Sequence, residues 1–113
     1  MNRPNFIELP TLDLARSQDF FGRVFGMKMT KFGPTYACTM TGDVDIGLQA
    51  DQTEVTKAPL TVIEVADLES TLAAVVATDA TITKPIFGFP GGRRFHFLDP
   101  SGNELAAMQR DST

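Results

Sequence analysis

The sequence is short of the residues that support a disulfide, a membrane span or a nucleic-acid surface. Cys38 is the single cysteine among 113 residues, which excludes an internal disulfide and fits the reducing cytoplasm. No apolar run approaches the length of a membrane span, and the N-terminal residues lack the apolar core of a signal peptide. The formal net charge is −4 and the longest basic cluster is Arg93-Arg94, so we expect neither a nucleic-acid nor a membrane partner.

Histidine is equally scarce, because His96 is the only one in the chain. The rest of the composition is typical of a soluble domain. Hydrophobic residues make up 42% and charged residues 21% of the chain, the balance of a globular protein. The length predicts one domain with a modest core.

The two halves of the chain repeat one pattern of predicted elements. Each half begins with a strand, near 5–12 and 60–65, followed by an aspartate that suits a helix N-cap, Asp13 and then Asp67. These caps stand 54 residues apart, and they predict helices over 14–25 and 68–77. Three shorter strands follow in each half. In the first half they are 27–31, 35–40 and 44–49.

The second half closes with a hairpin. A strand begins at 81–84, where Lys84-Pro85 is expected to end or bend it. The segment Asp99-Pro100-Ser101-Gly102 then has the chemistry of a tight turn between two strands. Strand alternation places Arg94, His96 and Leu98 on one face, and Glu104, Ala106 and Met108 on one face of the following strand.

Three phenylalanines and the cysteine are expected to have structural rather than functional roles. Phe20, Phe21 and Phe25 recur on the first predicted helix and are expected to anchor the core. Cys38 has no basic partner in the sequence and is expected to be a buried, inert thiol.

Three motifs resemble the vicinal oxygen chelate superfamily of glyoxalases, extradiol dioxygenases, and fosfomycin- and bleomycin-resistance proteins. They are Phe6-Ile-Glu-Leu-Pro10, the helix from Asp13-Leu14 to Val24-Phe25-Gly26, and Phe95-His-Phe-Leu-Asp-Pro-Ser-Gly-Asn103. The resemblance implies an α+β fold in which two βαβββ modules form paired curved sheets around a cleft. It implies a single domain over 1–113, with module one at about 5–50, a linker at 51–59 and module two at 60–110. It also implies a homodimer, since such modules leave sheet edges uncovered.

Enzymes of this superfamily bind a divalent metal with residues from four strands. Motif matching puts Phe6, Leu60 and Ala106 at three of those positions and places the fourth near Leu48 or Gln49. None of the first three side chains offers a lone pair. We therefore predict no metal and no cofactor.

Other side chains of the implied cleft are polar or aromatic. If the family geometry holds, the ligand-binding residues are Phe6, Glu8, Tyr36, Arg94, His96, Glu104 and Met108. His96 and Glu8 are the candidates for acid–base chemistry, since imidazole titrates near neutrality and an inward carboxylate is costly to bury. The structural alternatives are a hydrogen-bonded core histidine, a Glu8 that pairs with Arg94, and a solubilising Glu104.

The sequence predicts a glyoxalase/bleomycin-resistance-like protein of the cytoplasm that binds a small organic molecule between its modules without a metal. Whether it is an enzyme stays open. One alternative is a metal-free acid–base enzyme that uses His96, Glu8 and Arg94. The other is a metal-dependent glyoxalase or dioxygenase-type enzyme whose ligands are displaced from the matched positions by a shift of strand register. Nothing in the sequence names the ligand.

Overall fold

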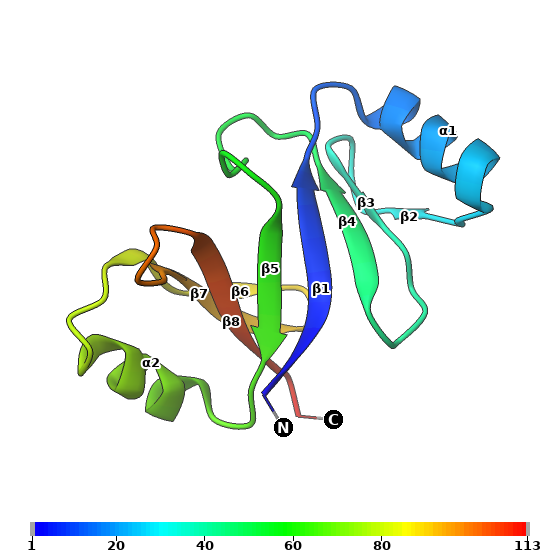
Figure 1. The fold of residues 1–113 in the computed structure, drawn as a ribbon. Helices are drawn as coiled ribbons and strands as arrows, with labels where there is room; N and C mark the ends of the chain where they lie inside the picture. The colour runs from blue at the N-terminus through cyan, green and yellow to red at the C-terminus, as the bar shows by residue number, and fades with distance from the viewer. Residues whose placement is uncertain (1, 113) are drawn as a thin grey trace. The chain divides into compact units, whose positions relative to one another are not determined.

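The computed structural model describes residues 2–112, which form two helices and eight strands. In chain order they are β1 (Arg3–Pro10), α1 (Leu14–Phe25), β2 (Thr30–Lys31), β3 (Tyr36–Cys38), β4 (Asp45–Gln49), β5 (Leu60–Glu64), α2 (Leu68–Val76), β6 (Ile82–Phe89), β7 (Gly92–Leu98) and β8 (Glu104–Arg110). Each half is a strand, a helix and three further strands (Figure 1). The predicted α+β fold with two βαβββ modules is confirmed.

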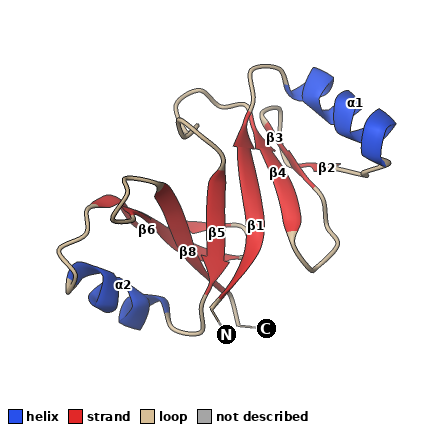
Figure 2. Cartoon of the chain, in the orientation of Figure 1, coloured by secondary structure: helices blue, strands red, loops and turns tan. Residues whose placement is uncertain are grey.

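Backbone contacts divide the chain into two compact units. The first unit holds Phe6–Leu60. The second unit holds the residues from Thr61 onward together with the start of the chain through Asn5. Each unit has its own helix (Figure 2), whereas β1 begins in one unit and continues in the other. We describe each unit by itself.

In the unit of Phe6–Leu60 the strand order is β2-β3-β4-β1. Strands β1 and β4 run parallel, with Glu8 opposite Gly47, and β3 pairs antiparallel with β4. One face of these strands packs against α1 through Leu14, Ala37 and Leu48. The helix begins where the Asp13 carboxylate accepts a hydrogen bond from the Arg16 amide, and it ends at Gly26, whose φ is +66°.

In the other unit the strand order is β5-β8-β7-β6. Strands β5 and β8 run parallel, whereas β7 pairs antiparallel with both β8 and β6. The core on the helix-covered face is built by Val65, Leu68, Phe95 and Ala107. Asp67 caps α2 by accepting a hydrogen bond from the Ser70 amide at 3.0 Å.

The structure corrects the expectation for two of the three phenylalanines of α1. Phe21 packs against the core, but Phe20 is 54% exposed and Phe25 is 61% exposed. The helix packs most closely at its first turn, where Leu14 is its one buried residue, and its later apolar side chains reach solvent. The two phenylalanines contact Phe21 and each other instead of the sheet.

The bounds of two strands and one helix also differ from the prediction. The strand expected at 27–31 is limited to Thr30–Lys31, and α2 ends at Val76. Strand β6 continues through Pro85, and its register against β7 shifts on both sides of Lys84. A proline is tolerated there because β6 is the outermost strand in this order and its pairing is irregular. Neither α1 nor α2 is long and apolar enough to cross a membrane.

Candidate functional site

The helix-free face of the second unit brings together four of the predicted site residues. Phe95, Ala107 and their neighbours face α2, so Arg94 and His96 of β7 point to the opposite side. Across the β7–β8 pairing, Arg94 lies opposite Met108, and His96 lies opposite Ala106. Glu104 is on the same face of β8, at its first residue.

His96 is fully buried on this face and has an acidic partner. Its Nδ1 atom lies 2.9 Å from Oε2 of Glu104, which also accepts a hydrogen bond from the Thr83 hydroxyl at 3.0 Å. The other ring nitrogen, Nε2, is buried without a hydrogen-bond partner among the described residues. The ring of Phe87 lies against the imidazole, with centroids 5.7 Å apart.

The surroundings of His96 keep its imidazole neutral. Burial lowers the pKa of His96, and the positive charges of Arg94 and Lys84 lower this pKa further. The hydrogen bond and the negative charge of Glu104 oppose this change without cancelling it. The lowered pKa favours the neutral imidazole, whose contact with Glu104 is a hydrogen bond.

Arg94 is held between two aromatic rings. Its guanidinium carbon lies 5.3 Å from the ring centroid of Phe87 and 5.5 Å from that of Phe89. The ammonium of Lys84 lies 5.6 Å from the Phe87 centroid. All three contacts have the geometry of cation–π interactions, so two positive charges are fixed close to His96.

A second polar network on this face was missed by the sequence analysis. The Asn5 amide donates to Oε1 of Glu64 at 3.1 Å, and Nε of Arg110 donates to Oε2 of Glu64 at 3.0 Å. The amide nitrogen of Asn5 also lies 3.6 Å from the Met108 sulfur. The one signal in the sequence was a glutamate at the end of a mostly apolar strand, since a buried carboxylate needs partners.

The remaining predicted residues lie in the first unit. Glu8 is buried, and the Tyr36 hydroxyl donates a hydrogen bond to its Oε1 at 3.0 Å. Phe6 and Tyr36 lie over Gly47, because a Cβ atom at Gly47 would be 2.6 Å from Cε2 of Phe6 and 2.7 Å from the Tyr36 hydroxyl. Phe6, Glu8 and Tyr36 therefore gather around one glycine of β4.

Strand register identifies the fourth position of the metal site implied by the resemblance. Ala106 lies opposite Val62, and Gly47 lies opposite Glu8. Val62 and Glu8 are equivalent in the two modules, so Gly47 is the counterpart of Ala106. The sequence placed this position near Leu48 or Gln49, and the register moves it to the neighbouring Gly47, while Leu48 is fully buried in the core under α1.

The donor set does not fit a metal of the kind that the resemblance implies. The four matched positions carry Phe6, Gly47, Leu60 and Ala106, none of which has a side-chain lone pair. Within residues 2–112, no group of three or more histidine, cysteine, aspartate or glutamate side chains is placed to hold a metal ion.

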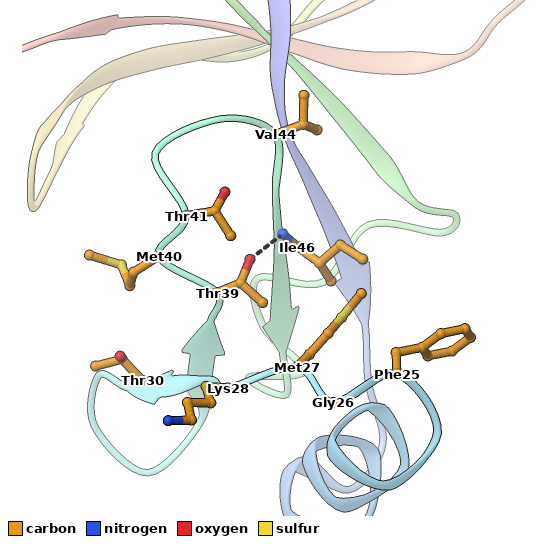
Figure 3. Close-up of a pocket in the computed structure, with 10 residues that line it drawn as sticks. All are labelled: Phe25, Gly26, Met27, Lys28, Thr30, Thr39, Met40, Thr41, Val44 and Ile46. Atoms are coloured by element: carbon orange, nitrogen blue, oxygen red, sulfur yellow. Dashed lines mark hydrogen bonds between the residues drawn. The ribbon is translucent and has the colours of Figure 1, made fainter.

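A groove of about 540 Å³ lies in the first unit (Figure 3). It is lined by the residues at the end of α1 and by β2–β4 and their connections: Phe25, Gly26, Met27, Lys28, Thr30, Thr39, Met40, Thr41, Val44 and Ile46. The Thr39 hydroxyl of the groove is already used within the protein, since it accepts a hydrogen bond from the Ile46 amide and donates one to Asp45. None of the predicted site residues lines the groove.

Cys38 adjoins this region but is not reactive. It is buried, and its sulfur lies 3.8 Å from the sulfur of Met40. Burial raises the pKa of the Cys38 thiol, and the charge of Asp45 raises it further, so the thiol stays protonated. This confirms the expectation of a buried thiol.

Comparison with known proteins agrees with the fold and the motifs. Residues 3–107 match the model of the Glyoxalase/Bleomycin resistance protein/Dioxygenase superfamily. No curated protein matches the sequence.

Three solved structures illustrate the likeness. A hypothetical protein from Bacillus halodurans C-125 is 13% identical with a TM-score of 0.80, over 99% of this chain and 96% of its own. Methylmalonyl-CoA epimerase from Mycobacterium tuberculosis is 11% identical with a TM-score of 0.76, over 97% and 89%. A superfamily member from Vibrio splendidus 12B01 is 19% identical with a TM-score of 0.69, over 98% and 100%. At these identities the structures establish the fold, and together with the family model they establish that the chain belongs to the glyoxalase/bleomycin resistance protein/dioxygenase superfamily.

Proposed function

We propose that this protein binds a small organic molecule without a metal and that His96 is its central contact. The observation that carries the proposal is the Nε2 atom of His96, which is fully buried and has no hydrogen-bond partner in residues 2–112. Buried polar atoms are nearly always paired in folded proteins, so an orphaned ring nitrogen requires a partner from outside the chain.

The surroundings of His96 suit an organic ligand. Phe87 and Met108 offer apolar contact, and Arg94 and Lys84 supply positive charge for an acidic group. In the first unit, Phe6, Glu8 and Tyr36 remain the predicted contacts. Metal independence is supported by the matched family positions, which carry two hydrocarbon side chains, a methyl group and a glycine.

An acid–base enzyme is the second candidate function. The observation in its favour is the pairing of a neutral, buried imidazole with a carboxylate. In such an enzyme His96 takes a proton from an oxygen or carbon acid at Nε2, and Arg94 stabilises the anion that remains. Turnover of a bound molecule separates this candidate from simple binding.

The test is a screen of a metabolite library by native mass spectrometry and ligand-observed NMR, with protein purified without chelators. Binding should weaken about tenfold in His96→Phe, the effect of losing one hydrogen bond. An acidic ligand should also bind more weakly to Arg94→Gln. Arg93→Gln is the matched control, because Arg93 lies on the same strand but pairs with Glu69.

Metal dependence is tested in parallel. Elemental analysis and calorimetric titration with Zn²⁺, Mn²⁺, Ni²⁺ and Fe²⁺ should detect no stoichiometric site of micromolar affinity. A stoichiometric metal that is lost in Glu8→Ala would overturn the proposal and favour the metal-dependent alternative. A library that yields no ligand sensitive to His96→Phe would overturn the binding site.

A further inference from the structure

We infer that Glu104 is a positioning residue that holds the His96 proton on Nδ1, so that the site accepts ligands which donate an O–H or N–H to Nε2. The tautomer is a property of the protein alone. The ligand class rests on the proposed function, and the two parts fail in different experiments.

The first step concerns the direction of the hydrogen bond between Glu104 and His96. Oε2 of Glu104 accepts a hydrogen bond from the Thr83 hydroxyl, and the same oxygen lies 2.9 Å from Nδ1 of His96. An oxygen that already serves as an acceptor and belongs to a carboxylate accepts from a second donor as well. Nδ1 therefore carries a proton, and Thr83 helps to hold the carboxylate in place.

The second step concerns the number of protons on the ring. Lys84 of β6 and Arg94 of β7 place positive charge near the imidazole, Glu104 of β8 places negative charge there, and the ring is fully buried. A neutral imidazole has one proton, so a proton on Nδ1 leaves Nε2 with a bare lone pair. The opposite tautomer would aim the Nδ1 lone pair at the carboxylate and leave an Nε2–H without an acceptor.

The ligand class follows from that lone pair. A hydroxyl, an amide N–H or a protonated acid can donate to Nε2. A carboxylate or sulfonate offers only acceptor oxygens and is rejected at this position, because two lone pairs would face each other in a buried site. The site therefore selects ligands that carry a hydrogen-bond donor. A pocket with positive charge alone would not impose this requirement.

The tautomer can be measured directly because the chain has one histidine. In the full chain purified without a histidine tag and labelled with ¹⁵N-histidine, all imidazole signals come from His96. At neutral pH we expect one protonated and one unprotonated ring nitrogen, with the proton assigned to Nδ1 through couplings to the ring C–H groups. A proton on Nε2, an average of the two tautomers, or a doubly protonated ring would overturn the inference.

Variants separate positioning from structural support. In Glu104→Ala, the preference for the Nδ1–H tautomer should be lost, while the backbone amide NMR spectrum should remain that of a folded protein. The control is Glu69→Ala. Glu69 lies on α2 of the same unit and pairs with Arg93 of β7, so its loss should leave the tautomer of His96 unchanged. Should Glu104→Ala fail to fold, Glu104→Gln serves, because its amide can either accept or donate and should give a mixture. A folded Glu104 variant that keeps the pure Nδ1–H tautomer would refute the positioning role.

The ligand class is tested with phenol, anisole, acetate and methanesulfonate as probes. Phenol should shift the Nε2 signal, whereas anisole, which lacks the donor, should shift it at least about tenfold less at equal concentration. Acetate and methanesulfonate should leave Nε2 unchanged. Equal shifts from anisole or acetate would overturn the donor requirement. A confirmed tautomer with no response to any probe would support the positioning role and overturn the ligand class.

Discussion

The ring of Phe6 lies over Gly47 in a position that leaves no room for a side chain on residue 47. A Cβ atom at Gly47 would lie 2.6 Å from Cε2 of Phe6, well inside the distance that carbon atoms tolerate. Phe6 and Gly47 are the two positions of the first module at which the resemblance implies metal ligands. The aromatic ring occupies the space that a side chain at position 47 would need, so a single substitution there cannot restore a donor.

This relationship predicts the effect of a small substitution. Gly47→Ala should lower the free energy of unfolding by about 1–3 kcal/mol, because the added methyl group forces Phe6 and Tyr36 to move. Urea denaturation measures the change. Gly88→Ala is the matched control, since a Cβ there has no atom within 4 Å, and it should stay within about 0.5 kcal/mol of the parent.

A double-mutant cycle then tests the pairing. In a Phe6→Ala background, Gly47→Ala should cost less than it does in the parent, because the ring that blocks the methyl group is gone. Equal costs in the two backgrounds would show that Phe6 does not restrict position 47.

Local patterns predicted the elements of this fold well because their causes are local. Asp13 and Asp67 cap the two helices as expected, and alternation along β7 correctly placed Arg94 and His96 on one face. The exposure of Phe25 was not predictable, because periodicity does not tell how far along its length a helix contacts the sheet.

The site was predicted less completely, for a physical reason. Glu64 meets Asn5 and Arg110, which lie 59 and 46 residues away in sequence. Such contacts depend on strand order and register, which no local pattern specifies. The role of Gly47 likewise emerged only from its pairing opposite Glu8.

The Glu64 network gives a second stability prediction. Glu64→Ala should lower the free energy of unfolding by about 1–3 kcal/mol, because the buried Asn5 amide loses its acceptor. Arg110→Ala should cost under about 1 kcal/mol, because the Arg110 side chain is 55% exposed and its ion pair is screened by water. Thermal or urea denaturation of both variants checks the order, and a larger loss in Arg110→Ala would contradict it.

The predicted homodimer can be examined at the exposed apolar side chains of the first unit. Val24 is 57% exposed and Met40 is 66% exposed, and exposed apolar side chains such as these are where an interface is tested first. We expect a dimer in analytical ultracentrifugation at micromolar concentration and a monomer for Val24→Glu. The control is Val76→Glu, at a residue of α2 that is 53% exposed. A parent protein that sediments only as a monomer would contradict the dimer.

Asp45 gives a prediction for acid pH. Its Oδ1 atom accepts hydrogen bonds from the Thr39 hydroxyl at 2.7 Å and from the Thr41 amide and hydroxyl at 2.8 and 2.7 Å, and its Oδ2 accepts from the Gly42 amide at 3.1 Å. Burial raises the pKa of Asp45, but these hydrogen bonds outweigh burial and hold the pKa below its usual range. The carboxylate thereby secures the connection between β3 and β4.

The unfolded chain takes up a proton at Asp45 before the folded chain does, so stability is lost as the pH falls. At neutral pH, Asp45→Asn should cost about 1.5–3 kcal/mol, because an amide cannot accept all four hydrogen bonds. The difference between parent and variant should shrink below about pH 5, as the pH approaches the ordinary aspartate pKa and then passes through the lowered one. Urea titrations at a series of pH values measure it, and Asp43→Asn makes the same change in charge in the same loop. A difference that stays constant or grows as the pH falls would show that the Asp45 carboxylate is not stabilised by these donors.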